Sequence, residues 1–158
     1  MMPRLNLPEY QPRTRLSKDG KEEIYDVVRR KFVRLTPEEW VRQHFINFFV
    51  SHHDYPLSLL QVEGKLTYNH LTKRSDIVVY GRNGKPLMAV ECKAPSVEIT
   101  QKVFDQLAMY NFTLGVSYLV LTNGMQNYIC RMEPEKGSYS FLEKFPAYAE
   151  LHEQFRDL

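Results

Sequence analysis

The segment LMAVECKAP, residues 87–95, combines the pattern of a buried strand with two charged side chains. Because successive side chains of a strand point to opposite faces, Glu91 and Lys93 share a face with Leu87 and Ala89. Charged residues are rarely buried unless they are paired. An acid and a base on the apolar face of a strand therefore indicate a candidate functional site.

The preceding segment, RSDIVVYGRNGKP (residues 74–86), predicts a hairpin with this strand. Asn83-Gly84 favours a two-residue type I′ turn, in which both central residues have positive φ. In that hairpin the numbers of facing residues sum to 167, so Asp76 faces Glu91. Their Cβ atoms would be about 4.5–5.5 Å apart, and the carboxylates repel unless a positive charge separates them. Mg²⁺ is commonly held by one or two carboxylates together with water and substrate phosphate, so the pair predicts a divalent-cation site.

An alternative interpretation needs no metal. Asp76 would cap a turn at the start of a strand, and Glu91 with Lys93 would be an exposed charged pair of the kind that discourages aggregation at a sheet edge. This alternative does not explain why the register set by a separate turn places one acid opposite another. We therefore favour the functional site.

Two segments have helical patterns. TPEEWVRQHFINFFV (36–50) begins with Thr36 as an N-cap, Pro37 at the first helical position and Glu39 at the capping-box position. Its apolar side leaves Glu39, Arg42 and Gln43 on a shared polar stripe. EITQKVFDQLAMYNFTLG (98–115) predicts the second helix, with a glycine as its stop signal.

The remaining segments predict strands and a short terminal helix. Strands are expected within 22–35, 57–68, 74–80 and 85–94, with two more around Asn123-Gly124 in 117–132, and a helix is expected in 146–158. This order predicts an α/β fold, a mixed β-sheet flanked by helices. We expect an N-terminal arm over 1–20 and a single domain over 21–158.

The composition limits the function classes. The chain has 158 residues, 43% of them hydrophobic, and a formal net charge of +2, so nucleic-acid binding would depend on local clusters of cations. Its two cysteines form no metal-binding pair or disulfide framework. No signal peptide or membrane-spanning run is recognisable, which predicts a cytoplasmic protein without membrane association.

Asp76 on one strand and Glu91-Cys92-Lys93 on the next resemble the motif of the PD-(D/E)XK, or restriction-endonuclease-like, nuclease superfamily. The ordered series TPEEWVRQ, RSDIVVY, VECKAP, DQLAMY and LTNG is similar to the N-terminal nuclease domain of type I restriction enzyme R subunits and their stand-alone relatives. The resemblance extends over about residues 24–132. A Glu-x-Lys triplet alone is common, whereas the ordered series is more specific.

The resemblance implies a metal-dependent endonuclease that hydrolyses DNA phosphodiesters. Asp76 and Glu91 would ligate Mg²⁺ or Mn²⁺, the backbone carbonyl of Cys92 would be a further ligand, and Lys93 would orient or help deprotonate the attacking water. Gln106 and Tyr110 match a Gln-x-x-x-Tyr pattern of some superfamily members, and their spacing places both on one helix face, near the site or the DNA. The alternative for Tyr110 is an aromatic core residue.

Other charged residues are weaker candidates. Glu39 and Glu63 are second-tier metal ligands, although the capping box already explains Glu39. Arg42, Arg74 and Lys73 would contact phosphate, or would be solvated surface charges.

The chain departs from the family pattern in two respects. Ser75 stands where the superfamily motif has proline, and the sequence has no G-x-x-x-x-G-K-[ST] motif for nucleotide phosphates. We therefore expect DNA as partner, with a motor (helicase) or specificity subunit supplied by another chain, and a homodimer where both strands are cut. The alternative functions are a nuclease-fold module that binds nucleic acid or a partner protein without cleavage, and a generic α/β interaction domain.

Overall fold

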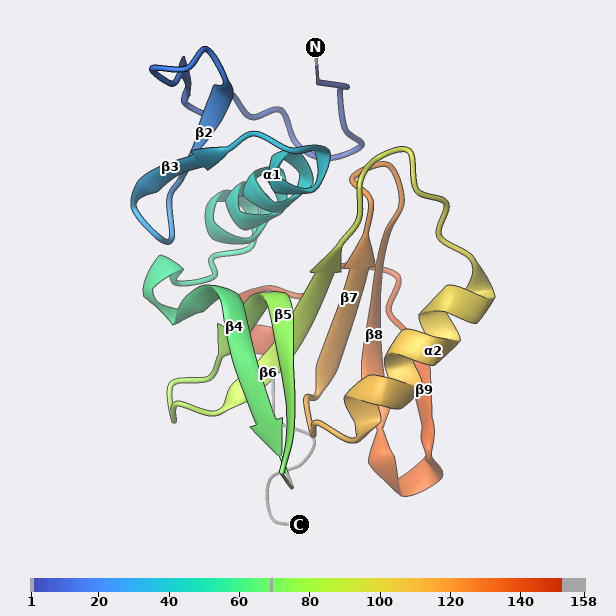
Figure 1. The fold of residues 1–158 in the computed structure, drawn as a ribbon. Helices are drawn as coiled ribbons and strands as arrows, with labels where there is room; N and C mark the ends of the chain where they lie inside the picture. The colour runs from blue at the N-terminus through green and yellow to red at the C-terminus, as the bar shows by residue number, and fades with distance from the viewer. Residues whose placement is uncertain (1, 69, 152–158) are drawn as a thin grey trace.

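The computed structural model describes residues 2–68 and 70–151 and has an α/β fold, as predicted. Six strands form a mixed sheet in the order β4-β5-β6-β7-β8-β9, and three more form a separate antiparallel sheet, β1-β2-β3 (Figure 1). The strands of the large sheet are β4 (Leu60–Tyr68), β5 (Leu71–Tyr80), β6 (Pro86–Cys92), β7 (Tyr118–Thr122), β8 (Asn127–Glu133) and β9 (Ser138–Phe141). Those of the small sheet are β1 (Thr14–Leu16), β2 (Glu22–Asp26) and β3 (Lys31–Arg34).

Helix α1 (Pro37–His52) covers one face of the large sheet. Thr36 caps it as predicted, because its hydroxyl oxygen accepts a hydrogen bond of 3.0 Å from the backbone N–H of Glu39. Val41, Phe45 and Phe49 are fully buried. They pack in one cluster with residues of the sheet that include Val62, Ile77, Val79, Met88, Val90 and Val120.

Helix α2 (Gln101–Phe112) covers the opposite face. Thr100 caps it by accepting a 3.2 Å hydrogen bond from the N–H of Val103. Phe104 and Ala108 pack in a second cluster with residues that include Leu66, Val78, Ala89, Leu119, Leu121 and Cys130. Each helix thus buries its apolar side on a different face of the sheet, which explains why β6 and β7 are apolar on both faces.

The chain passes from β6 through α2 to β7, and these two strands pair in parallel. The other neighbouring strands of the large sheet pair in antiparallel fashion. In Figure 1, α2 lies along the part of the sheet formed by β7, β8 and β9, and the small sheet lies beside α1.

The β5–β6 turn differs from the predicted type I′ turn. Only Gly84 has positive φ (+82°), and the N–H of Gly81 bonds to the carbonyl of Lys85 at 2.8 Å, which makes a three-residue loop. The ladder shifts between Val79 and Tyr80, so that Val79 pairs with Met88. This irregularity compensates for the longer loop. From Val79–Met88 to the last pair, Ile77–Val90, the residues therefore face each other as predicted, with residue numbers that sum to 167.

Other elements also differ from the prediction. The segment 22–35, expected to hold one strand, forms the β2–β3 hairpin, and β9 was not predicted. Tyr148–Glu150 is a single 3₁₀ turn where a terminal helix was expected, and the rest of that expected helix lies outside the described residues. Two more 3₁₀ turns are Leu57–Leu59 and Pro134–Lys136. None of the described helices is both long and apolar enough to cross a membrane.

Candidate active site

Asp76 and Glu91 lie just beyond the regular part of the β5–β6 ladder. The ladder ends at the pair Ile77 and Val90, one residue before the predicted carboxylate pair. Asp76 instead uses its side chain, because its Oδ2 accepts a 2.7 Å hydrogen bond from the backbone N–H of Cys92. The two acids therefore lie on adjacent strands, as the hairpin predicted, and a side-chain contact of Asp76 to the backbone of β6 takes the place of a ladder pair.

Glu91 is largely buried and is paired with a lysine. The Nζ atom of Lys73 donates a 2.6 Å hydrogen bond to Oε1 of Glu91, and the two side chains are 17% and 14% exposed. Burial raises the pKa of Glu91, the nearby charge of Asp76 raises it further, and Lys73 opposes both effects. From the sequence, a divalent metal ion was expected to balance the two carboxylates. In the structure, the ammonium of Lys73 supplies the positive charge at Glu91.

An irregularity between β4 and β5 explains how Lys73 reaches this position. Val62 pairs with Ile77 and Gly64 with Ser75, but the intervening Glu63 has a left-handed backbone with φ of +54°. Past this point the alternation of faces is reversed. Val62 and Ile77 pack toward α1, whereas Leu66, which pairs with Lys73, packs toward α2. Lys73 therefore lies on the α2 face, where Glu91 also lies.

A buried network of charges lies beside Asp76. Glu39 accepts hydrogen bonds from the guanidinium of Arg42, the amide of Gln43 and the guanidinium of Arg29. The polar stripe predicted on α1 is thus buried, and the carboxylate of Glu39 is saturated by three donor side chains. Burial opposes the charge of Arg42, but Glu39 outweighs this effect and raises the pKa of the guanidinium. Glu39 and Arg42 consequently support the site from α1.

Arg42 connects this network to the other acids. Its Nη1 is 3.8 Å from Oδ1 of Asp76 and 3.8 Å from Oε1 of Glu63. Arg74, predicted to contact phosphate, is 59% exposed and lies 3.9 Å from Oε2 of Glu63. Sequence reasoning missed Arg29, which lies in the β2–β3 turn, and did not identify Lys73 as the partner of Glu91.

A hollow of about 420 Å³ opens on the α2 side of the site. It is lined by Lys73, Glu91, Lys93, Val103, Gln106, Leu107, Tyr110 and Leu121. The structure therefore brings Gln106 and Tyr110 of α2 beside the Glu-x-Lys segment of β6. Tyr110 is 46% exposed, so it is not an aromatic core residue, and Nζ of Lys73 lies 5.4 Å from the centroid of its ring.

Lys93 is the exposed cation of this hollow. It follows the last residue of β6, and its backbone N–H continues the pairing with β7 through a 2.7 Å hydrogen bond to the carbonyl of Thr122. Its side chain is exposed, and among the described residues its ammonium forms no ion pair. A fixed backbone with an unpaired ammonium suits a group that acts on a bound anion.

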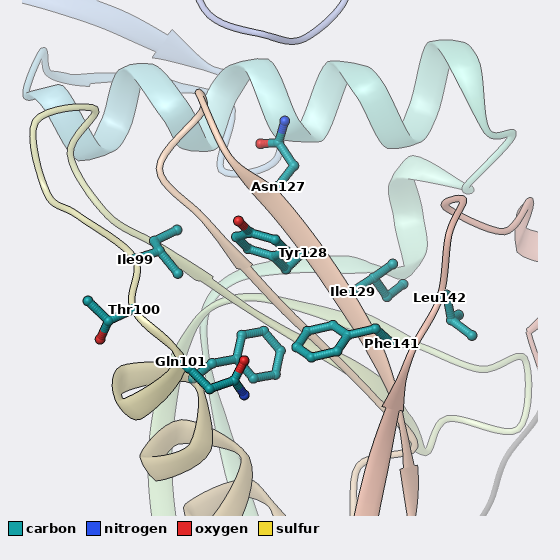
Figure 2. Close-up of a pocket in the computed structure, with 9 residues that line it drawn as sticks. Ile99, Thr100, Gln101, Asn127, Tyr128, Ile129, Phe141 and Leu142 are labelled. Carbon is teal, nitrogen blue, oxygen red and sulfur yellow. The ribbon is translucent and has the colours of Figure 1, made fainter.

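A second hollow, of about 310 Å³, lies at the start of α2 and contains none of the predicted site residues. Figure 2 shows Gln101 at the beginning of the helix, with Tyr128 and Phe141 near it on strands β8 and β9. The two hollows are therefore separate features of the α2 side of the sheet.

The donor set fits a divalent cation that is completed by other ligands. Asp76 Oδ2 is engaged by Cys92, but Oδ1 has only the distant contact with Arg42, and Glu91 adds a second hard oxygen donor. Among the described residues, no three His, Cys, Asp or Glu side chains gather closely enough to hold a metal ion by themselves. Mg²⁺ typically uses one or two carboxylates plus water and phosphate, which agrees with two protein carboxylates. Glu39, being saturated, does not fit as a ligand.

Comparison with known proteins identifies the family. The family model of the Type I restriction enzyme R protein N terminus (HSDR_N) matches residues 37–146. The chain belongs to this family. No curated protein matches it significantly. Membership in the HSDR_N family confirms the resemblance seen in the sequence and, at the level of the family, associates the chain with restriction systems and nuclease-like function.

Two solved structures are similar to this HSDR_N family member. One is a fragment assigned to an HsdR subunit of a type I restriction enzyme from Vibrio vulnificus YJ016, with 20% identity and a TM-score of 0.44 over 70% of this chain. The chain spans 24% of the length of that protein. The other is a protein of the DUF820 group from Anabaena variabilis ATCC 29413, assigned as a nuclease, with 15% identity, a TM-score of 0.46 and coverage of 94% of this chain and 90% of that one.

Proposed function

We propose that this HSDR_N family member hydrolyses DNA phosphodiesters with Mg²⁺, as an endonuclease of the PD-(D/E)XK type. One observation carries the proposal. Glu91 and Lys93 of the predicted motif line a hollow together with Gln106 and Tyr110, and Asp76 is joined to the same segment of β6 by its hydrogen bond from the N–H of Cys92. A buried carboxylate with a raised pKa at a concave surface, which Glu91 provides, is typical of an active site.

Asp76 and Glu91, with the backbone carbonyl of Cys92, would hold the metal ion. When bound, the ion would supply Lewis-acid stabilisation of charge on the phosphoryl oxygens and a water of lowered pKa. Glu63 is 43% exposed and its contacts with arginines are 3.7–3.9 Å long, so its carboxylate remains available as an additional ligand or water contact.

Lys93 would orient the attacking water and offset the negative charge that develops on the phosphate, because its ammonium is exposed beside Glu91 and has no acidic partner in the part of the chain that the structure describes. Gln106 and Tyr110 would contact the DNA strand along the wall formed by α2. Arg42 would hold Asp76 in place from the buried side, since it is fixed by Glu39.

The family suggests that other subunits take part. Type I restriction enzyme R proteins are the source of the family model, and this chain spans only part of the HsdR protein to which it is similar. A motor or specificity subunit would therefore supply translocation or sequence choice. A homodimer would place two such sites on opposite strands for a double-strand cut.

The decisive experiment is plasmid nicking by the purified protein with Mg²⁺ or Mn²⁺. The wild type is expected to convert supercoiled plasmid to the nicked form, and Lys93→Ala to lower the rate by about 100-fold or more, because a group near the developing charge is removed. Lys65→Ala, which removes an exposed lysine of β4, is the matched control and should leave the rate unchanged. Equal nicking by Lys93→Ala and wild type would exclude the assigned role.

A second candidate function is a nuclease-fold module that binds nucleic acid or a partner without cleavage. The observation that favours it is the Lys73–Glu91 ion pair, which balances the buried acid without a metal ion. Absence of nicking and of any metal response in the wild type would support this candidate.

A further inference from the structure

One face of the small sheet is built from arginines and aromatic rings. Tyr25 of β2 faces Phe32 of β3, and Glu23 faces Arg15 on one side and Arg34 on the other. The backbone of Arg13 bonds to that of Tyr25, which places Arg13 next to this face. We call this surface the arginine face; its members are Arg13, Arg15, Glu23, Tyr25, Phe32 and Arg34.

The opposite face of the small sheet packs against the rest of the protein. Ile24 and Asp26, which alternate with Glu23 and Tyr25 along β2, are fully buried. Because alternate residues of a strand point to opposite faces, the arginine face points away from this buried side. In Figure 1 the small sheet lies beside α1, at the outer end of the molecule. The arginine face is therefore available to a partner.

The aromatic rings hold two guanidinium groups in place. The Cζ atom of Arg15 lies 3.9 Å from the centroid of the Phe32 ring, and that of Arg13 lies 4.9 Å from the centroid of Tyr25. A guanidinium that stacks on a ring keeps its N–H donors directed to the sides, where they can bind phosphate oxygens. Ordering these side chains in advance lowers the entropy cost of binding an anion.

The charge of this face is only partly balanced. Glu23 pairs with Arg15 at 2.8 Å. Arg13 and Arg34 are exposed and have no carboxylate within salt-bridge distance among the described residues. The whole chain carries a net charge of only +2, so a cluster of this kind is the local feature that a polyanion would recognise.

The arginine face is structurally continuous with the candidate active site. Arg29, in the turn between β2 and β3, has Nη2 3.3 Å from Oε1 of Glu39 and Nη1 3.7 Å from Oε2 of Glu63. The neighbouring Arg30 and Lys31 are exposed. Basic side chains of the β2–β3 hairpin therefore extend from the arginine face to the edge of the candidate active site.

We propose that the arginine face binds the phosphate backbone of duplex DNA and guides the duplex to the Asp76–Glu91 site. This inference rests on the proposed function, which supplies DNA as the substrate. Duplex DNA is the favoured ligand because the guanidinium groups cover Tyr25 and Phe32, which leaves no free ring for stacking a base. The arginine face lies outside residues 37–146, the part of the chain that the family model matches.

The test is fluorescence anisotropy with a labelled duplex in EDTA, which prevents cleavage, over a series of salt concentrations. Arg13→Gln with Arg34→Gln is expected to weaken binding roughly tenfold or more at about 0.1 M salt, and to lower the slope of log Kd against log salt by nearly 2, or about 0.9 per lost phosphate contact. Arg82→Gln with Lys85→Gln, which removes two exposed cations from the β5–β6 turn, is the matched control and should change binding little.

Equal loss of affinity in the two double variants would overturn the proposal, because net charge alone would then explain the binding. If the wild type nicks plasmid but Arg13→Gln with Arg34→Gln keeps its affinity, the arginine face is refuted while the proposed function stands. If the wild type neither binds the duplex nor nicks plasmid, the proposed function fails, and this inference fails with it. Tighter binding of a single strand, equally dependent on Arg13 and Arg34, would overturn the assignment to duplex DNA.

Discussion

At the scale of single residues, Lys73 and a divalent cation would compete for the same carboxylate. Lys73 donates to Glu91 at 2.6 Å, so an arriving cation must displace the ammonium. In Lys73→Met this competition is removed, although the buried Glu91 then lacks its counter-charge. We expect Lys73→Met to be less stable than wild type without metal, by about 1–3 kcal/mol, and to gain more from Mg²⁺.

The measurement is the shift of the melting temperature at a fixed Mg²⁺ concentration. A tenfold tighter site adds about 1.4 kcal/mol of stabilisation at saturating metal, or roughly 3–6 °C for a protein of this size. Lys65→Met, on the neighbouring strand, should respond to Mg²⁺ like the wild type. Identical shifts in Lys73→Met and in Asp76→Asn would show that the cation does not bind at this pair.

At the scale of elements, the irregularity at Glu63 determines which side chains of β4 and β5 face α2. Glu63 adopts a left-handed backbone inside a strand, which costs a residue with a Cβ atom about 1–2 kcal/mol. Glu63→Gly and Glu63→Ala remove the same carboxylate, but only glycine relieves the backbone. We therefore expect Glu63→Gly to be more stable than Glu63→Ala by about 1 kcal/mol in urea unfolding.

The same pair of variants separates backbone from side chain in the site. If the carboxylate of Glu63 contributes to metal or water binding, both variants should lose nicking activity to a similar extent, whatever their stability. If Glu63→Ala were more stable than Glu63→Gly, the inference that the left-handed backbone at residue 63 is strained would be wrong.

At the scale of the whole molecule, the N-terminal segment joins α1 to the β7–β8 loop. Leu5 is buried, the N–H of Asn6 bonds to the carbonyl of Gly124 at 2.8 Å, and Trp40 donates its indole N–H to the carbonyl of Pro3. The contact is close, because a Cβ atom added to Gly124 would lie 2.7 Å from a methyl of Leu5. The segment is thus packed on the body of the protein.

Leu5→Ala tests whether the N-terminal segment unfolds cooperatively with the rest of the domain. We expect a loss of about 2 kcal/mol in the free energy of unfolding, near the lower limit for a buried leucine. Leu16→Ala, at a leucine that is 68% exposed, should cost less than about 0.5 kcal/mol. Similar small effects for both variants in urea denaturation would show that the N-terminal segment unfolds independently.

The sequence was sufficient for the features that depend on neighbouring residues. Thr36 caps the first helix, and the apolar alternation of residues 87–92 specifies a strand, because caps and faces depend on residues only a few positions apart. Thr100, the cap of the second helix, was not predicted. The turn was predicted less well. Its loop is one residue longer than the Asn-Gly signal suggested, and the correct register of Ile77 with Val90 results from a compensating irregularity.

By itself, the sequence determined the α/β class, the two helices with the Thr36 cap, and the placement of Asp76 and Glu91 on adjacent strands. Only the tertiary structure decided how their charges are balanced. The irregularity at Glu63 turns Lys73 to the α2 face, and the packing of the β2–β3 hairpin brings Arg29 to Glu39. The physical reason is that strand alternation is a local rule, whereas a change of face and a contact between distant elements depend on how the whole chain packs.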